Sequence, residues 1–253
     1  MVEYDPQDVG NTAWSFAKLG IYHEPLMQSI AAQARLLLPD FCPQNLTNLA
    51  WALATLSVSD VPLLTAIGCA AVARIKDFGP QNLSNTAWSY STLVVADLPL
   101  LSAISSSAIS RISEFASQSL GNTSWAFAHL GLRDQPLLYA IAAQSIRLLN
   151  SLGAQEMTNI AWSFASLALE HSPLMAALSS AARRSMSHFE PQNLSNTAWS
   201  YAVFGIVDPP LLHLISAQAL RIISQFSSQD LANTAWAFAT LSVCNQPLSS
   251  SIS

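Results

Sequence analysis

The sequence has few charged residues. Lys, Arg, Asp and Glu together make up 10% of its 253 residues, against about 25% in an ordinary soluble domain. Ten basic and fifteen acidic residues leave a net charge of -5, which argues against a broad basic surface that grips any nucleic acid. Solubility must therefore come from uncharged polar side chains, and any contact with a nucleic acid must rest on a local arrangement.

Long apolar runs are absent as well, although 51% of the residues are hydrophobic. Polar residues interrupt every apolar stretch well before the roughly 18 consecutive residues that a membrane-spanning helix needs. We therefore expect no membrane span. The N-terminus has neither an apolar secretory core nor an Arg-rich amphipathic presequence, so no targeting segment is visible.

Clusters of reactive side chains are missing too. Cys42, Cys69 and Cys244 stand in three different registers of an internal repeat, which argues against a disulfide framework or a metal cluster and favours a reducing compartment. The sequence shows no carboxylate pair, Gly-rich phosphate loop, nucleophile motif or metal-ligand spacing. We expect a non-enzymatic protein without a metal ion, a cofactor or a small-molecule substrate. The histidines are scattered, at His23, His129, His171, His188 and His213.

The sequence does contain a repeat that is marked by tryptophan. Its seven tryptophans follow one another at intervals of 37 residues, at Trp14, Trp51, Trp88, Trp125, Trp162, Trp199 and Trp236. A fixed period of this size indicates one supersecondary unit that is copied and stacked. The period leaves no place for a domain boundary, so we predict a single repeat domain over residues 1–253. Its units are 6–42, 43–79, 80–116, 117–153, 154–190, 191–227 and a partial 228–253.

Each unit has the pattern of two helices joined by a short turn. In the first helix, apolar residues recur five positions before Trp and two and five positions after it, and Thr, Leu or Ile stands two positions before it, which predicts one buried stripe at helical period. Its opening turn often holds a proline, which suits that position, at Pro6, Pro43, Pro80 and Pro191. The second helix has apolar steps of three and four residues. Antiparallel helical hairpins predict an all-α fold, a right-handed α-solenoid of stacked repeats.

The turn of each unit carries a start signal for the second helix. An Asp before Pro-Leu is typical of a helix N-cap, as at Asp60, Asp97, Asp134 and Asp208. His23 and His171 replace this Asp in their units, so we expect them to cap a helix or lie at the surface. The seventh unit stops a few residues into its second helix and neither end shows a polar capping repeat, a pattern compatible with a piece of a longer protein.

Three sets of repeated residues are candidates for structure or binding. We assign the tryptophans to the core, because their register is as fixed as that of the neighbouring leucines. A Gln stands seven residues before every Trp and an Asn three before it, and invariant amides suit structural bonding or a ligand backbone better than the reading of different bases. These asparagines are Asn11, Asn48, Asn85, Asn122, Asn159, Asn196 and Asn233.

Base contact is better suited to positions that vary from unit to unit. Positions six and four before Trp lie with Asn on one polar stripe, and an ordinary solvated helix face is the competing interpretation. The position four after Trp also varies, from Lys18 to His129 and Val203. The candidates for base contact are Asp8, Asn45, Asn82, Ser119, Glu156, Asn193 and Asp230, with Thr47, Ser84, Thr158 and Ser195.

Arginine is periodic near the end of the second helix. In an antiparallel hairpin this end lies beside the N-terminus of the first helix, where the helix dipole also favours an anion. A row of phosphates spaced one per unit would fit such an edge, and pairing with nearby acids or with the helix's own C-terminus is the alternative. The row consists of Arg35, Arg74, Arg111, Arg147, Arg184 and Arg221.

One stretch, Pro-Gln-Asn-Leu-Ser-Asn-Thr-Ala-Trp-Ser-Tyr-Ala over residues 191–202, carries a resemblance to known repeats. Together with the later Asp-x-Pro-Leu-Leu and Arg-Ile-x-x-Phe, it resembles the octotricopeptide and heptatricopeptide repeats of organelle RNA-binding proteins, and the 37-residue period matches the second kind. Many such proteins carry a C-terminal RAP domain, which is absent from this sequence. The resemblance implies first helices that line a surface for single-stranded RNA, about one nucleotide per unit.

Two functions follow from these observations. The first is a non-catalytic protein of a mitochondrion or chloroplast that binds a single-stranded organelle transcript or ribosomal RNA and acts in RNA stability, processing or translation. The second is a protein-binding scaffold that uses the concave surface of a stacked-helix array. The acidic balance favours the scaffold, whereas the arginine row and the resemblance favour RNA.

Overall fold

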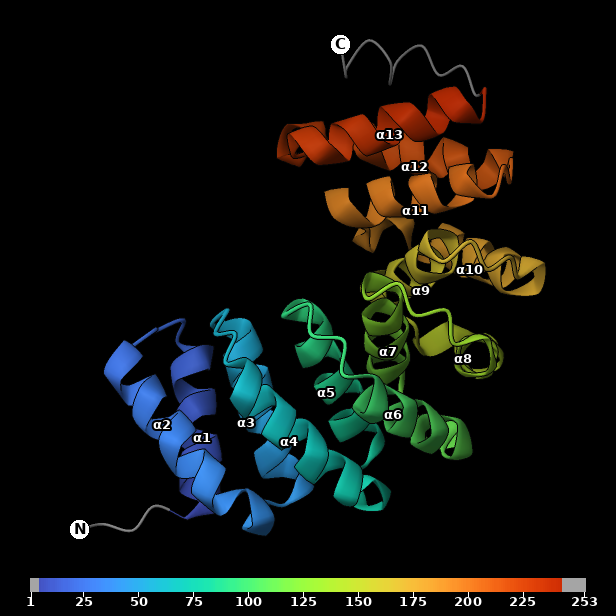
Figure 1. Ribbon diagram of the computed structural model, residues 1–253. Coiled ribbons are helices and arrows are strands. Elements are labelled where there is room, and N and C mark those ends of the chain that lie inside the picture. The colour runs from blue at the N-terminus through green and yellow to red at the C-terminus, as the bar shows by residue number, and fades with distance from the viewer. Residues whose placement is uncertain (1–4, 243–253) are drawn as a thin grey trace. The chain divides into compact units, whose positions relative to one another are not determined.

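The computed structural model describes residues 5–242. Within this range it contains thirteen α-helices, six short 3₁₀ helices and no strand (Figure 1). The predicted all-α solenoid of stacked helical hairpins is confirmed. The start of the second helix that we expected in the seventh repeat lies outside the described residues.

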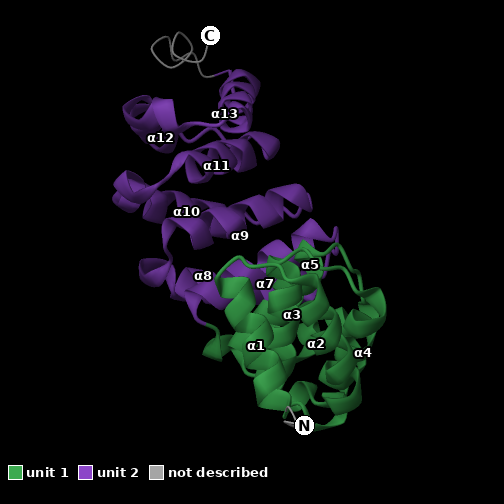
Figure 2. Ribbon diagram, turned by 90° about the vertical axis from the view of Figure 1, so that its left-hand side faces the viewer, with its two compact units in different colours: residues 1–115 green, residues 116–253 purple. Residues whose placement is uncertain are grey.

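The chain divides into two compact units, residues 1–115 and 116–253 (Figure 2). Unit 1 contains three hairpins, which are α1 (Pro6–Lys18) with α2 (Glu24–Leu37), α3 (Pro43–Thr55) with α4 (Val61–Ala73), and α5 (Pro80–Thr92) with α6 (Leu98–Ser110). Unit 2 contains α7 (Ser117–His129) with α8 (Gln135–Arg147), α9 (Ala154–Ser166) with α10 (Ser172–Ser185), α11 (Pro191–Val203) with α12 (Pro209–Ile222), and α13 (Ser228–Thr240).

A 3₁₀ turn follows every second helix and leads into the next repeat. These turns are η1 (Leu38–Asp40), η2 (Ile75–Asp77), η3 (Ile112–Glu114), η4 (Leu149–Ser151), η5 (Met186–His188) and η6 (Ile223–Gln225). The Phe that comes next is fully buried at Phe41, Phe78 and Phe189.

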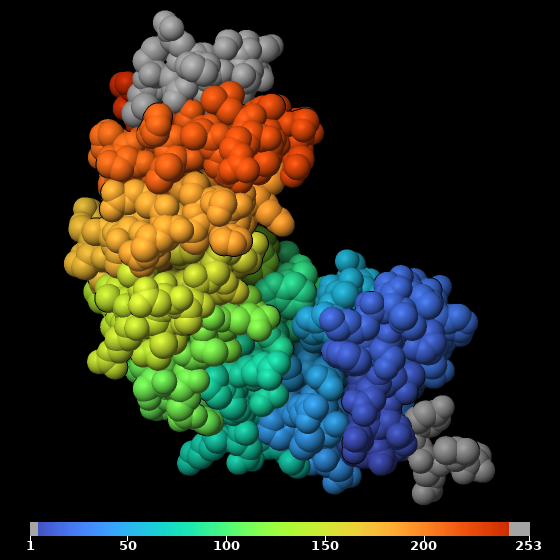
Figure 3. All heavy atoms as spheres, turned by 180° about the vertical axis from the view of Figure 1, so that it is seen from behind, coloured from blue at the N-terminus to red at the C-terminus, as the bar shows by residue number. Residues whose placement is uncertain are grey.

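Within each unit the helices form two layers. Each first helix packs along the next first helix, from α1 to α3 and α5 in unit 1 and from α7 to α9, α11 and α13 in unit 2. The second helices form the other layer, with α4 against α6 and α10 against both α8 and α12. Successive repeats of one unit therefore occupy neighbouring bands of colour in the space-filling view (Figure 3).

The predicted caps of the second helices are confirmed. The side chains of Asp60, Asp97, Asp134 and Asp208 each accept a hydrogen bond from the backbone N–H three residues later. His23 and His171 do the same through Nδ1, at 3.2 Å from Leu26 N and 3.1 Å from Leu174 N. Each cap satisfies one of the backbone N–H groups that the first turn of a helix leaves without a partner.

The first helices end in a left-handed residue six positions after Trp. Glycine fills this position at Gly20, Gly131 and Gly205, whereas Ser57, Val94, Ala168 and Ser242 hold it with φ between 49° and 56°. In repeat 3, Val94 N donates to Ser91 O at 3.0 Å and Val95 N to Tyr90 O at 2.9 Å, so the turn satisfies carbonyls at the helix end.

Candidate nucleic-acid interface

The tryptophans lie at the surface of the first-helix layer. Trp14 is 39% exposed and Trp236 is 47% exposed, and the other five are half-buried. The prediction that they fill the core is therefore wrong. The residues two positions after them fill it instead, among them Tyr90, Phe164 and Tyr201.

One line of side chains on each first helix shares this surface, and we call it the tryptophan stripe. It consists of the Gln seven before Trp, the Asn three before, Trp itself and the residue four after it. Steps of four, three and four residues bring these positions onto one helix face. The glutamines are all exposed, at Gln7, Gln44, Gln81, Gln118, Gln155, Gln192 and Gln229. The last positions of the stripe are Lys18, Thr55, Thr92, His129, Ser166, Val203 and Thr240.

Indoles of neighbouring repeats face each other within each unit. The ring centroids of Trp14 and Trp51 are 6.3 Å apart with planes inclined by 39°, and those of Trp199 and Trp236 are 6.5 Å apart with planes inclined by 35°. Stacked bases follow one another at about 3.4 Å, so a base between two parallel indoles needs roughly 7 Å. To admit one base, the rings of either pair would have to move slightly apart and turn parallel.

Residues at the end of the stripe contact the indoles. The ammonium of Lys18 lies 5.8 Å from the ring centroids of both Trp14 and Trp51, within the range of a cation–π interaction. The imidazole of His129 stacks on Trp125 at 4.7 Å with planes only 10° apart. In both places the variable residue of the repeat lies against the ring that is common to all repeats.

The amides of the stripe are mostly available to a ligand. Six of the seven asparagines are half-buried and Asn11 is exposed. Of these seven asparagines, all within the described residues, only Asn159 uses its side chain in a hydrogen bond, by accepting from Gln155 Nε2 at 2.8 Å. The structural bonding that we considered for these amides is therefore the exception, and the amides present donors and acceptors beside the indoles.

The positions four residues before Trp lie in the seam between first helices and not on the polar surface. Thr47, Ser84, Thr158 and Ser195 are all buried. Thr47 Oγ1 lies 3.3 Å from Thr86 Oγ1 of the next helix, and Thr158 Oγ1 lies 3.3 Å from Thr197 Oγ1. Ser195 Oγ donates to Asp230 Oδ1 at 2.9 Å. A base would reach these hydroxyls only if the seam opened.

The positions six residues before Trp cap the first helices. The side-chain oxygens of Asp8, Asn45, Asn82, Glu156, Asn193 and Asp230 accept from the backbone N–H three residues earlier. Asn45, Ser119 and Asn193 are buried, Asn82, Glu156 and Asp230 are half-buried, and Asp8 is exposed. Their principal role in the structure is the closing of the first helical turn.

The arginine row makes mainly structural contacts. Arg35 forms an ion pair with Asp60 at 2.6 Å, and Arg111 pairs with Glu114 at 2.7 Å and donates to Phe78 O at 2.6 Å. The hydrogen bond to Glu114 raises the pKa of Arg111 and lowers that of Glu114. Arg74 donates to Pro39 O of the preceding repeat.

The remaining arginines are less firmly held. Arg221 Nη1 donates to Gln218 Oε1 at 3.1 Å, and Arg184 donates to Ser180 Oγ at 3.0 Å and to Asn150 Oδ1 at 3.4 Å. Arg147 is exposed and makes no hydrogen bond or ion pair with the described residues. Arg147 and Arg184 are thus the members of the row most available to an anion.

Other kinds of site have no counterpart in residues 5–242. They contain no group of three or more His, Cys, Asp or Glu placed to hold a metal ion. No helix in that range is long and apolar enough to cross a bilayer. Cys42 and Cys69 are free thiols at the surface, and Cys244 lies outside the described range.

The sequence contains a pattern that indicates the tryptophan stripe, although we predicted base contact at other positions. The invariant Gln and Asn precede Trp by seven and three residues, which places all three on one helix face. The positions five and two before Trp and two after it are mostly buried, so Trp lies beside that buried stripe and not within it. A residue that recurs at the same position of every repeat can be buried in the core or can belong to a surface that all repeats share, and the spacing alone does not distinguish the two.

The comparison with known protein families also points to RNA. Residues 1–203 match the family model of the RNA-editing substrate-binding complex 6 protein. By its name, that family takes part in a complex that binds the substrates of RNA editing. No curated protein sequence matches the chain.

Proposed function

Since the chain belongs to the RNA-editing substrate-binding complex 6 protein family, we propose that it is a non-catalytic protein that binds single-stranded RNA along the tryptophan stripe. One observation carries this proposal: every described first helix presents an indole flanked by an amide at the surface. Aromatic rings stack on unpaired bases, and each such contact contributes about 1–3 kcal/mol with little regard to sequence. Paired bases in a duplex do not offer these faces.

About one nucleotide would be bound per repeat. The indole pairs at 6.3 and 6.5 Å have room for one base between two rings after a small opening. In this arrangement the invariant Asn and Gln bind the sugar-phosphate backbone or the edge of whichever base is present. Sequence preference would come from the variable residue four after Trp, which touches the ring in the first and fourth repeats.

The positions first assigned to base contact keep a smaller part in this proposal. Asp8 is exposed and Asn82, Glu156 and Asp230 are half-buried, so an RNA strand could touch them beside the stripe. The four hydroxyls in the seams would act only through the spacing of the first helices. Phosphate contact is assigned to Arg147 and Arg184, because Arg35 and Arg111 are engaged in ion pairs.

Few phosphates would be neutralised in this mode of binding. The stripe itself holds one lysine, Lys18, and the chain has a net charge of -5. The dependence of affinity on salt scales with the number of neutralised phosphates, so we expect binding that weakens only slightly as salt is raised. This distinguishes a stacking surface from a basic groove.

The wider setting rests on the resemblance to heptatricopeptide repeats. We propose a role in an organelle, a mitochondrion or chloroplast, in the stability, processing or translation of its transcripts or in its ribosomal RNA. Protein partners are proposed as well, since the family is named after a complex. The scaffold hypothesis predicts the opposite preference, a peptide ligand on the same aromatic surface and no competition by RNA.

The test measures the affinity for a random pool of single-stranded RNA, both of the unmodified chain and of variants that lack one indole of the stripe. Trp199→Ala and Trp236→Ala should each weaken binding about 5- to 150-fold, which corresponds to 1–3 kcal/mol per stacked base. Tyr139→Ala is the matched control, because Tyr139 is an exposed aromatic residue on the second helix α8. Equal affinity of all three variants and the unmodified chain would reject the proposal.

A further inference from the structure

The two indole pairs of the stripe are built alike, and we call each pair a slot. The first slot consists of Trp14 and Trp51 in unit 1, and the second of Trp199 and Trp236 in unit 2. Their ring centroids are 6.3 and 6.5 Å apart and their planes are inclined by 39° and 35°. Each slot also has the two asparagines three residues before its tryptophans and an exposed threonine four residues after its second tryptophan. These residues are Asn11, Asn48 and Thr55 in the first slot and Asn196, Asn233 and Thr240 in the second.

The two slots differ at the position four residues after the first tryptophan. The first slot has Lys18 there and the second has Val203, and both side chains are exposed. The Lys18 ammonium lies 5.8 Å from each ring centroid of its slot. A group midway between the rings would lie at half of their 6.3 Å separation from each, so the ammonium is at the edge of the slot and not inside it. It forms no ion pair or hydrogen bond with residues 5–242, so its three N–H donors are available.

Two effects favour the ammonium at this edge. Lys18 is the last residue of α1, where the partial negative charge of the helix end stabilises a cation. The faces of both indoles attract it as well. A base that stacks between Trp14 and Trp51 would therefore bring one of its edges to the ammonium. The sugar separates the phosphate of a nucleotide from its base, so a cation held over the rings meets the base edge first.

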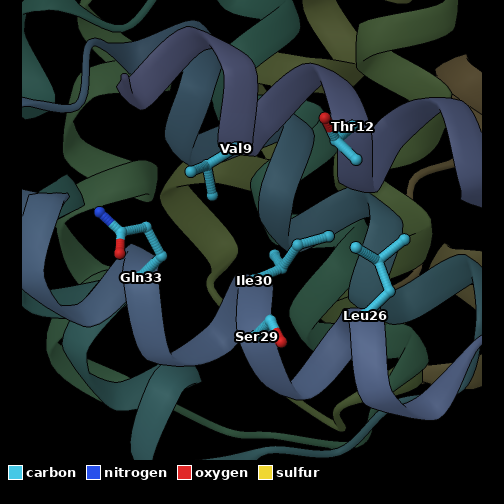
Figure 4. A pocket seen from close by; sticks show the side chains of 6 residues that line it. All are labelled: Val9, Thr12, Leu26, Ser29, Ile30 and Gln33. Atoms are coloured by element: carbon cyan, nitrogen blue, oxygen red, sulfur yellow. The ribbon is translucent and has the colours of Figure 1, made fainter. Parts of the chain in front are cut away.

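A pocket in the same repeat does not offer this kind of recognition. It has a volume of about 230 Å³ and lies between α1 and α2, and its side chains point into the space between the two helices (Figure 4). None of them is aromatic or charged, and none belongs to the tryptophan stripe. They are Val9, Thr12, Leu26, Ser29, Ile30 and Gln33. The slot, and not the pocket, combines a stacking surface with a cation.

The chemistry of an ammonium selects among the four bases. An ammonium donates hydrogen bonds and accepts none, so it needs a base edge that carries acceptors. Guanine presents two neighbouring acceptors, O6 and N7, and lysine contacts both of them in nucleic-acid recognition. Adenine has an amino donor beside N7, cytosine has an amino donor at N4, and uracil has a single carbonyl at O4. Guanine is therefore the base that suits the edge of the first slot.

We propose that Lys18 makes the first slot selective for guanine, whereas the second slot, with Val203 in its place, accepts every base. The preferred ligand is then a single-stranded RNA with a guanine at one fixed position. This inference rests on the proposed function, because it requires that the slots bind bases. It adds the identity of one base and of the residue that selects it.

The experiment selects a random pool of single-stranded RNA on the full chain and on three variants, with melting curves to check that each variant folds. The unmodified chain should enrich one guanine at a fixed position. Lys18→Met should lose this preference, whereas Lys18→Arg should keep it, because a guanidinium also donates to O6 and N7. Val203→Lys gives the second slot the residue of the first and should add a second enriched guanine.

Base analogues in the selected RNA then identify the edge that is contacted. Inosine keeps both O6 and N7, so it should bind as well as guanine. In 7-deazaguanine N7 is missing and in adenine O6 is missing, so each should weaken binding by about 5-fold or more, as for the loss of a specific base contact. The Lys18→Met variant should bind all four RNAs with equal affinity.

Two results would overturn the inference alone. One is a guanine preference that Lys18→Met retains, or no guanine preference in the unmodified chain, while Trp199→Ala still weakens binding. The other is a Lys18→Met variant that binds every sequence more weakly by the same factor and with a smaller dependence on salt, which is the result of a lost phosphate contact. A chain that binds no single-stranded RNA would overturn the proposed function as well.

Discussion

At the scale of single residues, a buried tyrosine and a capping aspartate connect a repeat to the second helix of the preceding repeat. We call this contact the joint. Tyr90 Oη donates to Leu64 O of the preceding repeat at 2.5 Å, and Tyr201 Oη donates to Met175 O at 2.6 Å. The capping Asp of the same hairpin reaches the same joint, and in unit 2 Ser179 Oγ donates to Asp208 Oδ2 at 2.5 Å. In unit 1 the position of Ser179 is Gly68, where an added Cβ would lie 2.5 Å from Asp97 Oδ2.

This joint predicts a loss of stability in alkali. Burial, together with the negative charge of Asp97, raises the pKa of Tyr90 above its usual value of 10.0, and burial and Asp208 raise that of Tyr201. The folded state keeps these protons while the unfolded state loses them, so the contribution is complete below pH 10 and declines above it. The free energy of unfolding should fall by up to about 1.4 kcal/mol per pH unit for each tyrosine.

The measurement is urea unfolding between pH 8 and pH 11. Tyr90→Phe and Tyr201→Phe should each flatten the decline above pH 10. Tyr139→Phe should leave it unchanged, because Tyr139 is exposed on α8. If the free energy of unfolding still declines above pH 10 in a variant that lacks both buried hydroxyls, other groups cause the loss of stability in alkali.

The structural roles of single residues were also the part of the structure that the sequence predicted least well. The caps Asp60, Asp97 and His171 could be identified, because a cap is a local interaction that the order of residues determines. The seam residues Thr47 and Thr158 could not, since a hydroxyl opposite another hydroxyl looks in sequence like one that faces water. Their burial depends on the close approach of two first helices, which a single helix pattern does not contain.

At the scale of elements, the end of every first helix is a left-handed turn that most repeats fill imperfectly. The position six after Trp has positive φ in all seven repeats, and only three hold glycine. Side chains with a Cβ are strained there, a β-branched one most of all. The period of the repeat fixes the turn even where its residue is unfavourable.

Val94 gives the clearest test of this strain. Its φ is 56° and its side chain is 71% exposed, so Val94→Gly relieves strain of about 1–2 kcal/mol and loses little packing. The greater freedom of glycine in the unfolded chain offsets about 0.5–1 kcal/mol. The variant should be more stable by about 1 kcal/mol in thermal or urea unfolding.

The reverse substitution is the control. Gly131 holds the same position with φ of 69° and has nothing near its missing Cβ. Gly131→Val should therefore destabilise by a similar amount for conformational reasons alone. Two variants with the same sign of effect would show that the left-handed conformation is not the source.

Elements as a whole were the most predictable part of the chain. The first helices begin at the predicted prolines, as at Pro43 and Pro191, and the second helices begin just after the predicted caps. Seven aligned copies make each start and stop visible several times. The 3₁₀ turns between repeats were not predicted, because the apolar residue that opens each of them continues the apolar pattern of the second helix.

At the scale of the whole molecule, a low charge and a periodic aromatic surface define what the chain can bind. The chain has seven tryptophans, and all of them lie on first helices at positions of the stripe. Their uniform spacing was predictable, whereas their exposure was not, because a repeat conserves a binding surface as strictly as a core. The proposed function uses this periodic surface, since a single strand of nucleotides is itself periodic.

Tryptophan fluorescence during titration with RNA tests this claim most directly, because every indole of the chain belongs to the stripe. Single-stranded RNA should quench the emission in a saturable way at a site size of about seven nucleotides, one per repeat, and the quenching should persist at raised salt. Duplex RNA of the same length should have little effect. Binding of single-stranded RNA with unchanged tryptophan emission would contradict the claim that the stripe is the interface.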